Sequence, residues 1–99
     1  MAFTVEYTFT RPSTDIDWTY SFSETGQTEI NNLRSNHGVT VSESTSEDGL
    51  TYRLIQSANS HADYSAYYYA ANDIWEAEGI MYACNTAGIT VALKLIENT

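Results

Sequence analysis

The sequence predicts an α+β two-layer sandwich, in which a four-stranded antiparallel sheet carries two helices on one face in the order βαββαβ. Three observations predict it: strand-like alternation near both ends of the chain, a central pair of strand-like segments joined by a turn, and helical periodicity between them. The 99 residues suffice for one domain with a single core, so we expect residues 1–99 to form one unit.

The first strand is expected over residues 2–10, which alternate between two faces. One face carries large apolar side chains, and the other carries threonines and Glu6; the apolar set is Phe3, Val5, Tyr7 and Phe9. The only proline, Pro12, ends the strand. Residues 15–22 allow two interpretations, a second strand or an extended loop whose aromatic residues cover the core edge. Asp15 and Asp17 favour the loop, because aspartate is depleted in strands.

A short helix is expected from the cap Ser23 to about Asn36, ending at His37-Gly38, with Ile30 and Leu33 facing inward. Strands follow at 39–45 and 50–57. The turn between them ends in Gly49, as suits a hairpin. The last strand, 89–96, places Ile89, Val91, Leu93 and Leu95 on one face.

The longest helical pattern lies in residues 60–86, with Ser60 as the N-cap and Asp63 in the first turn. Its apolar and aromatic residues recur at helical spacing and are expected to face the sheet: Tyr64, Tyr67, Tyr68, Ala71, Ile74, Trp75, Met81 and Tyr82. Tyr69 points away on the same helical wheel.

Glu78 conflicts with this pattern. In an unbroken helix its carboxyl group would lie inside the apolar stripe, where burial would raise its pKa and make it a candidate general base. A bend at Gly79 would instead take Glu78 to the rim, and Ile80 on the otherwise polar arc supports such a bend.

Charge and motifs restrict the function. Asp and Glu number 13 against 4 Lys and Arg, a formal net charge of −9. This balance argues against nucleic-acid and anionic-membrane partners. The single cysteine, Cys84, excludes an intrachain disulfide. No signal-peptide core or long apolar run occurs, so an intracellular (host cytoplasm) or virion location is expected rather than secretion through a signal peptide.

No HxxxH, CxxC, phosphate-binding glycine loop or GxSxG motif occurs, so the sequence predicts no metal site and no cofactor. His61 with Asp63 and Tyr64, at the start of the helix, could form a small acid–base cluster between helix and sheet. The catalytic candidates are accordingly weak: His61, Tyr64, Tyr68 and Glu78.

The βαββαβ order resembles the ferredoxin-like fold and, within it, the dimeric α+β barrel proteins, over nearly the whole chain. That resemblance implies a pocket between the second helix and the sheet. The opening FTVEYTFTRPSTDIDWTYSF resembles small uncharacterised proteins of tailed phages that infect marine bacteria, which names no activity.

Three functions follow as hypotheses. The first is a non-catalytic protein–protein interaction or assembly module, homo-oligomeric and phage-encoded. The open sheet face and exposed aromatic residues would form its interface: Glu6, Arg53, Ile55, Lys94, Trp18, Tyr20 and Tyr69. The second is a small-molecule-binding protein or enzyme of the dimeric α+β barrel type, and the third is an acidic inhibitor of a host protein.

Overall fold

The computed structural model describes residues 2–16 and 23–98. Its elements follow the predicted order, with the second helix in two parts: β1 (Phe3–Thr10), α1 (Glu24–His37), β2 (Thr40–Thr45), β3 (Thr51–Ala58), α2 (His61–Ala77), α3 (Ile80–Ala87) and β4 (Thr90–Asn98). The predictions for Trp18 and Tyr20, and the choice between strand and loop at residues 17–22, fall outside the described residues.

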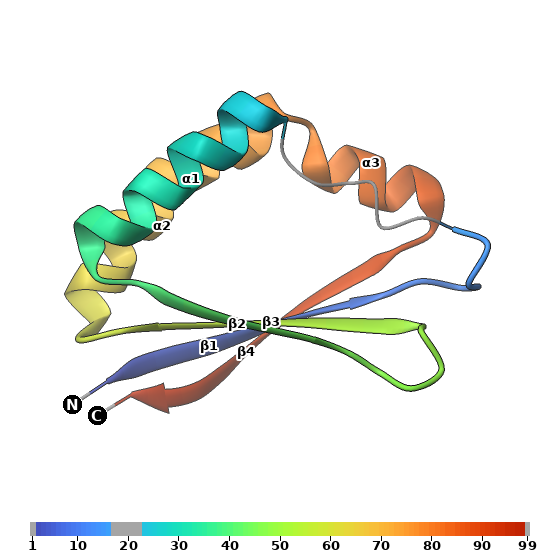
Figure 1. Ribbon diagram of the computed structural model, residues 1–99, viewed down its shortest axis with the longest axis horizontal. Helices are drawn as coiled ribbons and strands as arrows, with labels where there is room; N and C mark the ends of the chain where they lie inside the picture. Colours follow the sequence, from blue (N-terminus) through green and yellow to red (C-terminus); the bar gives the residue numbers. More distant parts are fainter. Residues whose placement is uncertain (1, 17–22, 99) are drawn as a thin grey trace.

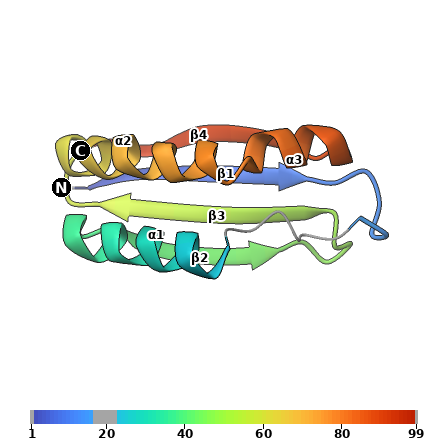
Figure 2. The same ribbon diagram turned by 90° about the horizontal axis from the view of Figure 1, so that it is seen from above.

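The four strands form one antiparallel sheet in the order β2-β3-β1-β4. The helices cover one face of this sheet and leave the other open (Figure 1). Viewed from above, α1 lies over β2 and β3, whereas α2 and α3 follow β1 and β4 (Figure 2). The arrangement confirms a ferredoxin-like α+β sandwich, and it makes β2 and β4 the edge strands.

Helix α1 begins and ends where the local sequence predicts. The Ser23 side chain accepts a hydrogen bond from the Gly26 amide at 3.1 Å, and Gly38 ends the helix in the left-handed conformation. Helix α2 is capped in the same way, since the Ser60 hydroxyl accepts from the Asp63 amide at 3.1 Å. These caps satisfy amides that the first turn leaves without helical partners.

The core consists of two clusters on the helix-facing side of the sheet. One cluster joins β1, β3 and α2 with Val39, which precedes β2: Phe3, Val5, Val39, Ala58, Tyr64 and Tyr67. Leu33 of α1 packs against it. The other lies beneath α3: Phe9, Ile80, Cys84 and Ile89. Tyr7, in the middle of the central strand β1, packs against both clusters.

The second helix breaks at Gly79, which adopts the left-handed conformation with φ of 66° between α2 and α3. The break turns Ile80 into the core, where it is 4% exposed, and turns Tyr82 outward, where it is 79% exposed. The prediction that Tyr82 faces the sheet was therefore wrong, because it extended a single helical period across Gly79. The bend itself was predicted.

Candidate functional site: a pocket between the helices and the sheet

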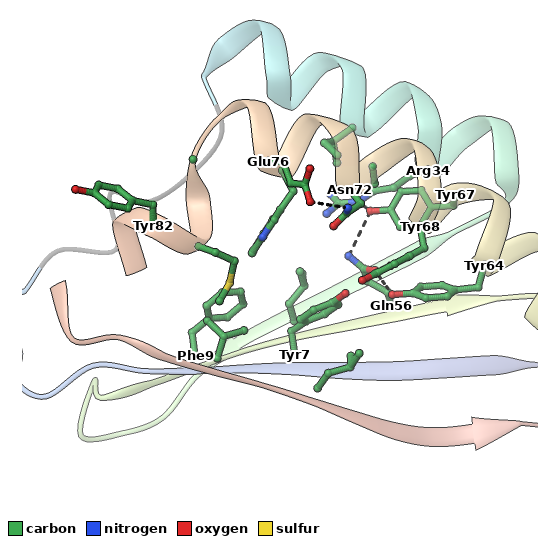
Figure 3. Close-up of a pocket in the computed structure, with 18 residues that line it drawn as sticks. Tyr7, Phe9, Arg34, Gln56, Tyr64, Tyr67, Tyr68, Asn72, Glu76 and Tyr82 are labelled. Carbon is green, nitrogen blue, oxygen red and sulfur yellow. Dashed lines mark hydrogen bonds between the residues drawn. The ribbon is translucent and has the colours of Figure 1, made fainter. Parts of the chain in front are cut away.

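A cavity of about 480 Å³ lies between the helical layer and the sheet (Figure 3). Its volume lies within the range of about 300–1,000 Å³ that small-molecule sites occupy. Every described helix and strand except β2 contributes to its wall. The lining includes Tyr7, Phe9, Arg34, Gln56, Tyr64, Tyr67, Tyr68, Asn72, Trp75, Glu76, Met81, Tyr82, Val91 and Leu93.

One end of the pocket is polar and is organised by Gln56, which is 4% exposed. The Tyr64 hydroxyl donates to Gln56 Oε1 at 3.3 Å, and Gln56 Nε2 donates to the Tyr67 hydroxyl at 3.4 Å. The Tyr67 hydroxyl also accepts from Arg34 Nε at 3.3 Å. This chain of bonds satisfies the buried amide and orients the Arg34 guanidinium against the pocket wall (Figure 3).

The hydroxyls of Tyr7 and Tyr64 at this end remain protonated at neutral pH. Burial raises the pKa of Tyr64 far above its usual value, and the neighbouring Tyr7 hydroxyl raises it further. Burial likewise raises the pKa of Tyr7, which shares a hydrogen bond with Tyr64. At neutral pH both hydroxyls can therefore form hydrogen bonds, but neither is a phenolate that could act as a base.

The other end of the pocket is apolar and aromatic. Phe9 packs against Trp75 with ring centroids 6.3 Å apart and against Tyr52 at 5.7 Å. Met81 and Val91 add aliphatic and thioether surface. The pocket thus combines an apolar floor with a small set of converging polar groups, which is the composition of ligand sites.

The structure brings two of the four predicted catalytic candidates into this pocket. Tyr64 and Tyr68 line it, whereas His61 and Glu78 do not. The exposed His61 begins α2, and its ring packs edge-on against Phe3 at 4.9 Å. The predicted acid–base cluster therefore does not assemble around His61.

Glu78 holds the start of α1 instead of facing the pocket. Its carboxylate accepts a hydrogen bond from the Ser23 amide at 2.6 Å, and bonding to the Ser23 hydroxyl and amide lowers its pKa. The alternative of a buried Glu78 with a raised pKa is therefore wrong, because it required a helix continuous through Gly79, whereas the alternative of a bend at Gly79 is confirmed.

Arg34, Gln56 and Trp75 were not among the predicted site residues. They come from α1, β3 and α2, and no sequence spacing connects them. For Arg34 the available signal was compositional, since it is one of four cations in an acidic chain, and for Trp75 it was the helical period that directs this residue toward the sheet.

The predicted interface on the open sheet face contains one ion pair. Arg53 Nε lies 3.2 Å from Glu6 Oε1, and the Arg53 side chain is 52% exposed. Ile55 and Lys94 lie opposite Glu6 on the two neighbouring strands. An exposed pair of this kind contributes less than about 1 kcal/mol. Tyr69 is exposed on α2, as predicted.

A second apolar surface lies along the other side of the molecule. We call it the α3–β4 surface, and its members are Met81, Tyr82, Leu93 and Leu95, of which the first three also line the pocket. Leu93 and Leu95 are 56% and 55% exposed although their register places them on the helix-facing side of the sheet. The helices therefore leave the outer edge of β4 uncovered.

The described residues contain no group of three His, Cys, Asp or Glu side chains placed to hold a metal ion. Within the same residues, no helix has both the length and the apolar character needed to cross a membrane.

Comparisons with known proteins show the fold. No protein-family model and no curated protein matches the chain. A hydantoinase/carbamoylase family amidase from Burkholderia ambifaria superposes with a TM-score of 0.50 at 13% identity, over 99% of this chain and 28% of the amidase. A hydantoinase/carbamoylase family amidase from Burkholderia multivorans gives 0.45 at 16% identity, over 97% and 27%. The chain therefore spans little more than a quarter of either amidase.

Proposed function

We propose that this protein is a non-catalytic assembly module that forms a homo-oligomer through the α3–β4 surface. The observation that carries the proposal is a nine-residue edge strand, β4, whose large apolar side chains remain exposed. An edge strand presents unpaired backbone groups that can pair with another chain, and natural proteins usually protect such edges with charge or cover.

The two edges of this sheet differ in that protection. The edge strand β2 carries Ser42, Glu43 and Ser44, a polar run with a charge. The edge strand β4 carries Leu93, Leu95 and Ile96 around Lys94, with Glu97 next to its last residue. The contrast favours β4 as the associating edge, because pairing through β2 would remove water from the Glu43 carboxylate, which is energetically unfavourable.

The charge distribution favours a second copy as the partner. The chain carries a net charge of −9, so two copies repel over most of their surfaces. No acidic residue occurs between Glu78 and Glu97, and Lys94 is the only charged residue in that stretch. Two copies can therefore approach through α3 and β4 without bringing carboxylates together.

A two-fold axis through Leu93 gives a consistent antiparallel pairing of two β4 strands. Leu95 of each copy then faces Val91 of the other, and Lys94 faces Ala92 rather than the second lysine. This pairing joins residues 90–96 of the two strands over about 23 Å, and the joined edges would form one continuous sheet with apolar contacts on its helix-facing side.

The test is solution mass by light scattering over a dilution series. Leu95→Lys is expected to give a monomer, whereas Ser44→Lys on the opposite edge leaves the oligomer intact. Arg53→Glu separates this arrangement from association through the open sheet face, because only the latter would lose mass on that change. A wild-type monomer at every concentration would contradict self-assembly and would favour the acidic inhibitor of a host protein.

Phage origin remains part of this proposal. The resemblance of the first fifth of the chain to phage proteins supports it, and an assembly role in the host cytoplasm or the virion would suit such a product.

A further inference from the structure

We propose that the pocket binds an amphipathic small molecule with a flat aromatic or alicyclic body and a single anionic group, whose charge meets Arg34. This inference does not require self-assembly, since the pocket lies within one chain, although Met81, Tyr82 and Leu93 line the pocket and also belong to the α3–β4 surface. It goes beyond an assembly role by assigning the pocket an occupant of defined chemistry.

We infer the anionic group of the ligand from the contacts of the Arg34 guanidinium. Among the described residues, its guanidinium forms no ion pair with any carboxylate, and its hydrogen bond from Nε goes to the Tyr67 hydroxyl. A guanidinium has five N–H donors, so that bond leaves the two Nη groups available for a carboxylate or sulfonate. An arginine without an acidic partner is notable in a chain where acids outnumber bases by 13 to 4.

The flat body follows from the walls. Tyr7 and Phe9 project into the pocket from β1, and Tyr68 projects from α2 on the opposite side (Figure 3). Trp75, also on α2, belongs to the lining as well. Aromatic faces on both sides of a cavity favour ring systems that stack between them. The hydroxyls of Tyr7 and Tyr64 stay protonated, so neither places a phenolate charge opposite a bound anion.

Aromatic walls can also enclose a cation, but the charged groups argue against that occupant here. The acidic lining residue is Glu76, which is exposed and accepts a hydrogen bond from Asn72 at 3.3 Å. The basic lining residue, Arg34, is half-buried and would repel a cation deeper in the pocket.

Two fluorescent probes with the same ring framework test the inference. One is 1-anilinonaphthalene-8-sulfonate, which is anionic, and the other is N-phenyl-1-naphthylamine, which lacks the sulfonate. Titrations at about 0.15 M salt screen the overall negative field, because the Debye length is then about 8 Å. We expect saturable binding of one probe per chain, with the sulfonate bound more tightly.

Arg34→Gln is expected to weaken binding of the sulfonate about tenfold or more, since a hydrogen bond to a charged group is lost, and to leave the uncharged probe within about twofold. Arg53→Gln, the matched change on the open sheet face, should alter neither. Tyr68→Ala should weaken both probes because it removes a wall. Circular dichroism confirms that each variant is folded.

Competition identifies the ligand class. Displacement by 1-naphthylacetate but not by 1-naphthylmethylammonium supports an anionic occupant. The proposal would be overturned if Arg34→Gln weakened the binding of both probes equally. It would also be overturned if 1-naphthylmethylammonium displaced the sulfonate as well as 1-naphthylacetate does, or if binding did not saturate. Repeating the titrations on Leu95→Lys separates this site from the α3–β4 surface, because pocket binding must survive there with its Arg34 dependence.

Discussion

The carboxylate of Glu78, at the end of α2, accepts a hydrogen bond from the backbone amide of Ser23, at the start of α1, with 2.6 Å between Oε1 and N. The two residues are 55 positions apart. Gly26 makes the approach feasible, because a Cβ atom at that position would collide with the Glu78 carboxylate. The start of α1 is thus fixed by the end of α2.

A double-mutant cycle tests this relationship. Alanine is normally favoured over glycine within a helix by about 1 kcal/mol. In the wild-type background, however, we expect Gly26→Ala to lower the free energy of unfolding, because the new methyl group displaces Glu78 from Ser23. In the Glu78→Ala background the same change should become stabilising. Urea unfolding of the four proteins measures the coupling, and additive effects would contradict the contact.

The lowered pKa of Glu78 predicts a pH dependence with a defined sign. Its pKa in the folded state lies below that of the unfolded chain. The contribution to stability is therefore present above the unfolded pKa, about 4.3, and is lost as the pH falls through the folded value. The urea concentrations at the midpoints of unfolding of wild type and Glu78→Gln should therefore become equal as the pH is lowered. Glu29→Gln, on α1, supplies the control, and a constant difference at all pH values would refute the linkage.

We expect position 79 to favour glycine because of its left-handed backbone conformation alone. Its φ of 66° disfavours other L residues by about 1–2 kcal/mol, and nothing lies within 4 Å of a Cβ built there. Gly79→Ala should therefore destabilise the protein by about 1 kcal/mol, and Gly79→Asn by less, because asparagine tolerates this conformation. Thermal unfolding of both variants checks the order; equal stability of alanine and glycine would contradict the break.

Self-assembly through β4 predicts a response to salt as well as to mutation. Because the two copies are acidic elsewhere, added salt should screen their repulsion and strengthen the oligomer. Sedimentation equilibrium at low and high salt measures this change in wild type and Ser44→Lys. If salt instead weakened the oligomer, ion pairs such as Glu6–Arg53 would be implicated, and the open sheet face would become the preferred interface.

Much of the fold could be predicted because its signals are local. The serine caps at Ser23 and Ser60, the alternation of β1, and the glycine between α2 and α3 each depend on residues close in sequence. The candidate site could be predicted only in part. Tyr64 and Tyr68 followed from the helical period, whereas Arg34 and Gln56 enter the pocket through the pairing of α1 with α2 and of β3 with β1.

The sequence alone determined the element order, the helix ends, the bend at Gly79 and the acidic character of the chain, because hydrophobic period, capping and charge are properties of neighbouring residues. Only the tertiary structure decided the strand order, which places β4 at an edge, and the contact of Glu78 with Ser23. It also decided that Leu93 and Leu95 stay exposed although their pattern is that of a buried strand. Burial depends on which element lies above a residue, and that follows from packing between distant parts of the chain.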